Sequence, residues 1–350
     1  MAGVPYDGVL TKADGKGLWW EGFDPDDLYA QYGHAVSPYA RDRKMQHDNP
    51  GDPPVPAFCE KLYNRMQDLI AQHHPNLLYF DDYKLPLYGI DQYYGLGIAA
   101  GLYNDSIACN NGQNEAVMTG KNLEEFENKR LVNDLEAGRE REIRDLPWQS
   151  DVCIGNWFYK KGTKYRDAAQ VVRGIIDVVS KNGNVLLSIP VRADGTIDNE
   201  EQVIVDNIGK WFEINAEAIH GTRPWLAFGE GPSIKENEAD RPKGGIFFYR
   251  RVPYTPLDFR FTAKGDTLYA FAMAWPYDGR LVIRSLAKGA KKLGGSVTSV
   301  RLLGNKETLA YHQTANGLEV TLPANRPCEY AFVLQISGLT WPILRECQRP

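Results

Sequence analysis

The sequence lacks the features that mark several large protein classes. It has no basic block, and 40 Lys and Arg against 45 Asp and Glu give a formal net charge of -5, which argues against a nucleic-acid partner. The longest apolar runs, such as Leu268 to Trp275, are too short to span a membrane. The N-terminus shows no charged segment followed by an apolar one, so no signal peptide is visible.

Cysteine is scarce and widely spaced. The five cysteines form no CxxC pair, and their odd number argues against a disulfide framework or structural zinc. Neither a glycine-rich phosphate loop nor a GxSxG nucleophile elbow occurs. His73 and His74 are adjacent, which suits a metal poorly because their rings point in different directions at a helix end. The cysteines are therefore expected to be free thiols packed as small hydrophobes: Cys59, Cys109, Cys153, Cys328 and Cys347.

What the chain does contain is a globular composition, with 43% hydrophobic and 24% charged residues. Its 350 residues are more than one core usually holds. Up to about residue 225, apolar stretches of strand length alternate with stretches of helical period, which indicates a parallel sheet with crossover helices. The predicted strands are 76–81, 115–120, 151–155 and 184–190, and the predicted helices lie near 58–70, 166–181 and 199–219.

Beyond residue 225 the pattern changes to short β-type runs separated by turn signals. The runs are 267–275, 281–284, 300–303, 318–322 and 330–336. Several short strands at this spacing indicate an antiparallel sandwich. We therefore predict two domains. Residues 1–228 form the C-terminal part of a (β/α) barrel behind a long N-terminal loop, and residues 240–338 form a β-sandwich.

The predicted barrel is short of strands. Only about four βα units can be placed before residue 225, whereas a closed barrel has eight. The first fifty residues are rich in Gly, Asp, Pro and Tyr and have the pattern of a loop. We expect roughly half of the barrel to lie upstream of Met1. The alternative is that the loop region contains a strand that its pattern does not reveal.

Two carboxylates are candidates for chemistry. Asp81 ends a buried strand, and strand ends face the active-site mouth of a barrel. Glu136 follows in the segment 133–139. Glycoside hydrolysis uses two carboxylates that flank one bond. Simpler explanations stay open, because Asp81 and Asp82 can cap a turn and Glu136 lies among Glu, Lys and Arg residues typical of a solvated helix face.

Aromatic and polar residues gather in two neighbouring segments, 147–150 and 155–159, which include Trp148 and Trp157. Sugars present C–H faces that stack on aromatic rings and hydroxyls that need fixed polar partners, so such sets are frequent in carbohydrate sites. The same residues equally fit core aromatics around a strand.

Three longer segments resemble the α-L-fucosidases of glycoside hydrolase family 29. Residues 75–82 (PNLLYFDD) resemble the strand P-D-x-x-W-F-D-G, with Tyr79 in place of Trp and Asp82 in place of Gly. Residues 178–190 (VVSKNGNVLLSIP) resemble V-S-x-N-G-N-x-L-L-N-I-x. Residues 211–225 (WFEINAEAIHGTRPW) resemble a segment ending N-G-E-A-I-Y-G-T-R-P-W.

The resemblance implies a (β/α)8-like TIM barrel, here without its first strands, followed by a C-terminal antiparallel β-sandwich. It implies retaining, exo-acting hydrolysis of terminal α-L-fucose from fucosylated oligosaccharides or polysaccharides, with no metal or organic cofactor. It also suggests a secreted or periplasmic protein. Two alternatives stay open: a degenerate, non-catalytic carbohydrate-binding protein, and another barrel glycosidase such as a β-galactosidase-like enzyme. A β-galactosidase-like enzyme would share the paired carboxylates with this chain but would not contain the Asn-Gly-Asn and Glu-Ala-Ile segments.

The resemblance also assigns roles to residues. Asp81 takes the place of the nucleophile. Many relatives carry the acid/base in a Pro-Trp-Glu motif, whose last position here is Gln149, and a neutral amide cannot protonate a leaving group. Other relatives place the glutamate earlier, which implies Glu136. Lys121 lies where a cationic sugar-site residue is expected, and Trp157 where an aromatic packs near the sugar.

The early His-Trp-Gly and Lys-His-His-Asp-Gly-Phe motifs of the family, which supply histidines to fucose hydroxyls, are absent from the sequence. We therefore expect this polypeptide alone to have little or no fucosidase activity. The measurement is release of nitrophenol from 4-nitrophenyl α-L-fucoside, and a turnover close to that of a full-length relative would refute the expectation.

Overall fold

The structure is a computed structural model that describes residues 11–23, 56–81, 93–121, 123, 125–234, 248–249 and 253–342. The chain forms two compact units, Met1–Asp134 and Leu135–Pro350. Most of the predicted N-terminal loop and Asp82 lie outside the described residues. None of the described helices is long and apolar enough to cross a membrane.

The first unit contains three neighbouring parallel strands. A 3-10 helix, η1 (Lys12–Gly15), precedes α1 (Pro56–His73), β1 (Leu77–Tyr79), α2 (Tyr93–Cys109), β2 (Val117–Lys121), α3 (Glu125–Asn128) and β3 (Val132–Glu136). β1 pairs with β2, and β2 with β3, in parallel. The last two residues of β3 belong to the second unit. Buried apolar residues fill the space between the helices and strands of this unit, among them Ile70, Ile98, Leu102 and Met118.

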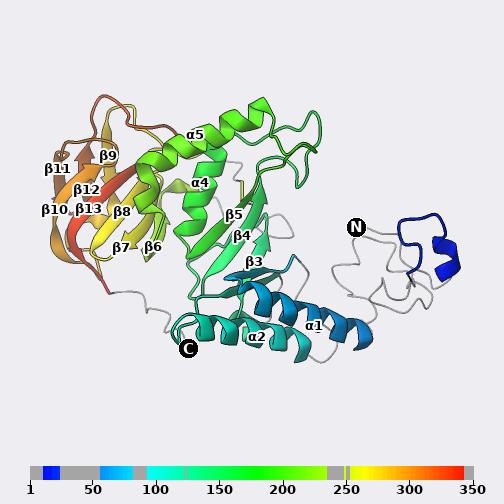
Figure 1. The fold of residues 1–350 in the computed structure, drawn as a ribbon. Coiled ribbons are helices and arrows are strands. Elements are labelled where there is room, and N and C mark those ends of the chain that lie inside the picture. Colours follow the sequence, from blue (N-terminus) through cyan, green and yellow to red (C-terminus); the bar gives the residue numbers. More distant parts are fainter. Residues whose placement is uncertain are drawn as a thin grey trace. The chain divides into compact units, whose positions relative to one another are not determined.

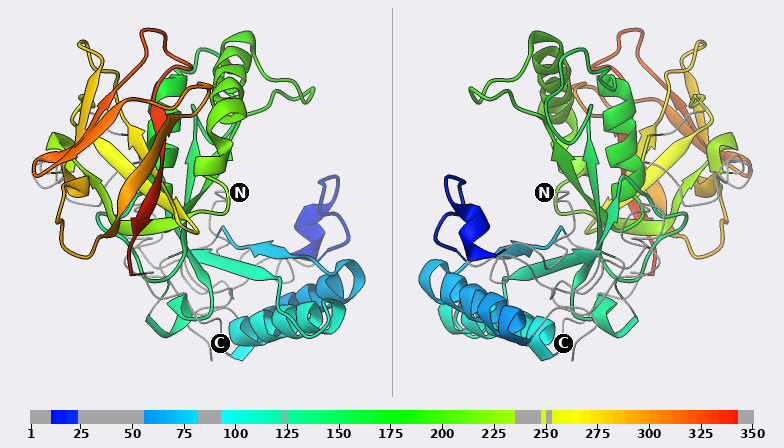
Figure 2. Two further views of the ribbon diagram at one scale, coloured as in Figure 1. Left: turned by 90° about the vertical axis from the view of Figure 1, so that its left-hand side faces the viewer. Right: turned by 90° about the vertical axis from the view of Figure 1, so that its right-hand side faces the viewer.

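Helices α1 and α2 lie side by side (Figure 1), and both side views agree (Figure 2). The Gln67 side-chain amide donates to the Gly97 carbonyl at 3.1 Å. A Cβ at Gly101 would lie only 2.4 Å from the Gln67 Oε1 atom. Glycine lowers helix propensity, and no helix was predicted over the glycine-rich α2. Its glycines instead allow the two helices to pack closely.

The second unit begins with a parallel pair of strands. β4 (Trp148–Cys153) pairs with β5 (Gly183–Ser188), and α4 (Ala168–Val179) lies between them in sequence. Asp167 caps α4 by accepting from the Gln170 amide, and Asp198 caps α5 (Asn199–Asn215) by accepting from the Glu201 amide. Such caps satisfy amides that have no partner within the helix. The predicted strands and helices of this region are confirmed.

Two antiparallel sheets complete the second unit, as the sequence predicts. The larger has the order β10-β13-β8-β7-β6 and the smaller β11-β12-β9. After a short 3-10 helix, η4 (Ala216–Ala218), the strands are β6 (Arg223–Glu230), β7 (Phe259–Lys264), β8 (Thr267–Ala272), β9 (Arg280–Ile283), β10 (Gly294–Leu302), β11 (Tyr311–Thr314), β12 (Gly317–Thr321) and β13 (Phe332–Thr340), and η5 (Arg284–Leu286) follows β9. The domain boundary placed between residues 228 and 240 stays a prediction.

The larger sheet is buried on both faces. Along β8, Leu268 and Ala270 belong to the core between the two sheets. The intervening Tyr269 and Phe271 belong to a second core, which also contains buried residues of α4 and α5 such as Trp211. Successive side chains of a strand point to opposite faces. Burial of both faces therefore explains why the sequence around β8 is almost continuously apolar.

A carboxylate and three cations are buried together in the second unit. The Arg260 Nε and Lys181 Nζ atoms each lie 2.7 Å from an Asp177 carboxylate oxygen, and Arg139 Nη1 lies 3.4 Å from one of them. Burial raises the pKa of Asp177, but the charges of Lys181, Arg260 and Arg139 outweigh it, so the pKa lies well below its usual range. Asp177 is on α4 and Arg260 on β7, so this cluster joins the helical layer to the large sheet.

Candidate active site

The C-terminal ends of β1, β2 and β3 bring three charged side chains together. The strand register pairs Tyr79 with Thr119, and Lys121 with Asp134. Asp81 follows Tyr79 by two positions, so it lies level with Lys121 on the neighbouring strand. In parallel α/β folds, ligands bind at this edge of the sheet.

The three charged side chains are Asp81, Lys121 and Asp134, and Lys121 lies between the two carboxylates. Its Nζ atom lies 2.8 Å from Asp81 Oδ1 and 3.7 Å from Asp134 Oδ2. The Tyr79 hydroxyl donates to the same Asp134 oxygen at 2.8 Å. One ammonium group therefore lies between two carboxylates, and the phenol orients the second of them.

The burial of the three charges differs sharply. The Asp134 side chain is fully buried and that of Lys121 is 9% exposed, whereas that of Asp81 is 74% exposed. A buried charge is costly unless it is paired, so Asp134 fixes Lys121 in place. Lys121 in turn orients an accessible Asp81 carboxylate. An accessible and oriented carboxylate is suited to act as a nucleophile.

Glu136 is the last residue of β3, not part of a helix. It follows Asp134 by two positions, so alternation along the strand places both side chains on the same face. The next residue, Ala137, has a positive φ of 48°, a conformation that is costly for a residue with a Cβ. Its amide donates to the Asp151 carbonyl at 2.7 Å and its carbonyl accepts from the Phe248 amide at 2.8 Å. These bonds hold the chain directly after Glu136.

The residues around the Pro-Trp motif divide into core and surface. Trp148 is fully buried and its indole N–H donates to the Lys181 carbonyl at 3.0 Å. Gln149 is also buried, and the Oε1 atom of its side chain accepts a hydrogen bond from the side-chain amide of Asn184 at 3.2 Å. Trp157 lies in the loop after β4 and is 45% exposed. Trp148 is therefore a core residue, and Trp157 is free to stack on a ligand.

Of the residues singled out in the sequence, Asp81 and Lys121 contact each other in the first unit. Glu136 and Trp157 belong to the second unit. Asp134 and Tyr79 were not chosen as site residues, although both belong to the cluster. Lys121 and Asp134 lie near the ends of two successive strands, and this arrangement could have pointed to Asp134. It was not seen because β3 was not predicted as a strand.

The comparisons with known proteins match the chain in two parts. The α-L-fucosidase family model matches residues 26–217, and the model of the α-L-fucosidase C-terminal domain matches residues 254–337. The chain belongs to the α-L-fucosidase family.

Individual relatives are distant in sequence. The tissue α-L-fucosidase of Bos taurus is 25% identical over 299 residues, which cover 80% of this chain and 54% of the bovine protein. An α-L-fucosidase of Branchiostoma floridae is 26% identical over 202 residues, 55% of this chain and 38% of that protein. The chain thus spans about half the length of the curated relatives it matches, or less.

Solved structures confirm the fold. An α-fucosidase of Thermotoga maritima in complex with fucose is 20% identical, with a TM-score of 0.58, and the match covers 81% of this chain and 57% of that one. Isoenzyme 1 of the Paenibacillus thiaminolyticus α-L-fucosidase is also 20% identical, with a TM-score of 0.59 and coverage of 89% and 69%. The predicted fold, strands of a TIM-like barrel followed by a β-sandwich, is borne out.

Proposed function

We propose that this chain carries the catalytic carboxylates of a retaining exo-α-L-fucosidase, with Asp81 as the nucleophile. The observation that supports this most is the contact of Asp81 with the buried Lys121 at the end of β1, inside the region matched by the family model. The Thermotoga maritima relative holds fucose, which supports a fucosylated oligosaccharide or polysaccharide as the substrate.

The reaction takes two displacements. The Asp81 carboxylate attacks the anomeric carbon of the fucosyl residue while the Glu136 carboxyl protonates the departing glycosidic oxygen. This leaves a fucosyl ester on Asp81 and a Glu136 carboxylate. Glu136 then takes a proton from water, the resulting hydroxyl attacks the anomeric carbon, and Asp81 leaves as a carboxylate. Both carboxyl groups return to their starting state, and fucose keeps its anomeric configuration.

The remaining residues bind or position. The Lys121 ammonium group orients the attacking oxygen of Asp81, and it stays in place because Asp134 and Tyr79 hold it from the buried side. We assign Trp157 to stacking against the apolar face of a sugar, since its ring is exposed in the loop after a barrel strand.

The test is hydrolysis of 4-nitrophenyl α-L-fucoside by the polypeptide of the complete reading frame that contains this sequence. Hydrolysis with fucose released as the α-anomer supports the proposal, and release of the β-anomer contradicts a retaining mechanism. Calorimetric titration with fucose tests the degenerate alternative, which predicts binding of the sugar with no hydrolysis.

The acid/base assignment makes a separate prediction. In the same polypeptide, Glu136→Ala is expected to lower fucoside hydrolysis by about 10²- to 10⁴-fold, the usual contribution of general acid–base catalysis. Azide needs no base, so it should attack the fucosyl ester on Asp81, restore turnover and give α-L-fucosyl azide. Gln149→Ala is the matched control and should show no azide rescue. Rescue of Gln149→Ala instead of Glu136→Ala would move the acid/base role to another residue.

Lys121→Met is expected to lower kcat/KM by about 10²-fold, a loss typical of misplacing a reacting group by about 1 Å. It should also lower the free energy of unfolding by about 3 kcal/mol, because the buried Asp134 carboxylate loses the Lys121 ammonium group. The double variant Lys121→Met/Asp134→Asn removes the Asp134 charge as well. It should regain most of the stability, measured by thermal denaturation, and none of the activity. Regained activity would show that Lys121 has only a structural role.

A further inference from the structure

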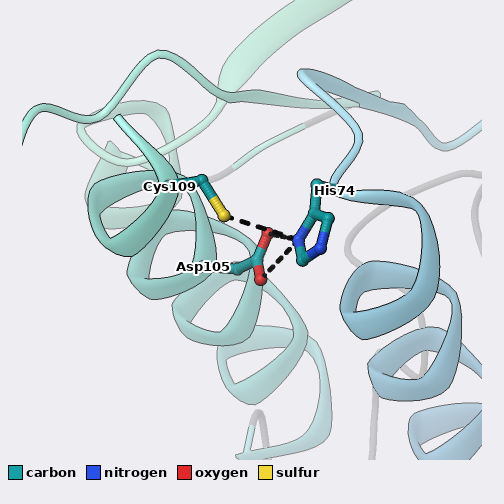
Figure 3. Close-up of side chains that lie close together, drawn as sticks. All are labelled: His74, Asp105 and Cys109. Atoms are coloured by element: carbon teal, nitrogen blue, oxygen red, sulfur yellow. Dashed lines mark hydrogen bonds and ion pairs between the residues drawn. The ribbon is translucent and has the colours of Figure 1, made fainter. Parts of the chain in front are cut away.

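Three side chains of metal-ligand type meet on the first unit, and none of them belongs to the proposed active site (Figure 3). The His74 Nδ1 atom lies 3.0 Å from both carboxylate oxygens of Asp105. It also lies 3.5 Å from the Cys109 Sγ atom. The ligand atoms of all three residues lie within 4.8 Å of one another.

The backbone explains why these residues meet. Asp105 and Cys109 are four positions apart in the last turns of α2, so they share one face of the helix. His74 directly follows the last residue of α1, and its amide donates to the Ile70 carbonyl at 2.9 Å. Its φ of 46° is left-handed, so the chain turns out of the helix at this residue. Because α1 and α2 run in parallel, their C-terminal ends lie at the same end of the pair.

The electrostatic environment favours a cation. The C-terminal end of a helix carries a partial negative charge of about half an electron, and here the ends of an 18-residue and a 17-residue helix come together. The Asp105 carboxylate adds a full negative charge. The His74 side chain is 53% exposed and the Cys109 residue is exposed, so an ion reaches them directly from solvent.

We propose that His74, Asp105 and Cys109 bind one zinc ion. Zinc accepts nitrogen, oxygen and sulfur ligands together, and three protein ligands leave the fourth tetrahedral position for water. Magnesium and calcium prefer oxygen ligands alone. None of the three zinc ligands takes part in the proposed hydrolysis of fucosides. The zinc proposal therefore does not depend on the proposed function.

The two separations that involve His74 are close to those of a zinc site. Zinc bonds of about 2.0–2.3 Å in a tetrahedron place the ligand atoms roughly 3.4–3.6 Å apart. The nitrogen–sulfur separation of 3.5 Å already has this value. The nitrogen–oxygen separation of 3.0 Å must widen by a few tenths of an ångström, as the hydrogen bond between His74 and Asp105 is replaced by two bonds to the metal.

The experiment is titration of the purified, metal-free chain with Co²⁺ as a spectroscopic probe and with Zn²⁺ as the competitor. Wild type should bind one Co²⁺ with a thiolate-to-cobalt charge-transfer band, and Zn²⁺ should displace it. Cys109→Ser should abolish the band. His74→Ala and Asp105→Ala should each weaken affinity at least about tenfold, since removal of even an outer partner of a ligand costs 10- to 100-fold. Thermal denaturation with and without Zn²⁺ is the second readout, and the three ligand variants should be stabilised less than wild type at the same Zn²⁺ concentration.

Two control variants match the proposed ligands. His73→Ala removes the neighbouring exposed histidine, and Cys153→Ser removes another free thiol. Both should bind Co²⁺ as wild type does. The proposal is overturned if His73→Ala weakens binding as much as His74→Ala does. It is equally overturned if only Cys109→Ser has an effect, because that result describes a metal adduct of an exposed thiol rather than a three-residue site.

Discussion

Replacement of Asp81 by glycine should lower α-L-fucoside hydrolysis by at least about 10⁴-fold in the polypeptide of the complete reading frame, a loss of the size seen when a catalytic nucleophile is removed. Without this carboxylate no ester with the sugar can form. Lys121 loses its contact with the Asp81 carboxylate, and Asp134 still pairs with it. The variant should therefore fold normally, which circular dichroism checks.

Azide identifies the role of Asp81 more sharply than the loss of rate does. It fits into the space left by the carboxylate and attacks the anomeric carbon from the same side. With an activated fucosyl donor, Asp81→Gly should give β-L-fucosyl azide, the opposite anomer to that expected from Glu136→Ala. The matched control is Asp68→Ala, which removes an exposed acid of α1 in the same unit and should keep wild-type turnover. If Asp81→Gly also keeps its rate, the nucleophile is another residue.

The second large effect is expected at Asp177. Asp177→Asn leaves Lys181, Arg260 and Arg139 as buried or nearly buried cations around a neutral amide. Removing one partner from a buried ion pair costs about 3–5 kcal/mol. For a unit of this size that corresponds to a fall of about 10 °C in Tm. Asp206→Asn, an exposed acid on α5, is the control and should change stability by less than about 0.5 kcal/mol.

The pH dependence of this effect has a defined sign. The three cations lower the pKa of Asp177 in the folded state below its unfolded value, which is about 4. The stabilisation is therefore fully present above about pH 4 and is lost as the pH falls through the folded pKa. The difference in Tm between wild type and Asp177→Asn should be constant from about pH 5 to 7 and shrink in stronger acid. Above this window Lys181 also titrates, because burial lowers its pKa to about 8. A difference that grows as the pH falls would contradict the assigned charge state.

The sequence predicted the helices and strands whose residues follow a clear apolar pattern between turn signals. α4 repeats its apolar positions with helical spacing, and the strands of the sandwich lie between clear turn signals. β3 was missed because its five residues, VNDLE, include only two apolar ones. The acidic residues of β3 lie at the C-terminal edge of the sheet, where we propose the active site, and acidic residues weaken the hydrophobic pattern by which a buried strand is recognised.

The residues of the proposed site were predictable only where a local sequence pattern marks them. Asp81 follows a buried apolar strand, and a family motif surrounds it, so both kinds of signal pointed to it. Asp134 and Tyr79 contribute through contacts across strands that are distant in sequence. The Asp177 cluster draws on Arg139, Lys181 and Arg260, which are separated by up to 121 positions (260 minus 139). Contacts between residues so far apart in sequence cannot be predicted from the spacing of residues along the chain.

Burial of the large sheet on both faces has a consequence for the independence of the sandwich. A module that is attached through one surface can be exchanged between proteins, because its own core is complete without its neighbour. Here, one face of β8 and β13 completes the core that contains α4 and α5. The indole of Trp211 also donates to the Ala331 carbonyl at 2.8 Å. The sandwich and the last helices of the barrel thus share one core, and neither has a complete core without the other.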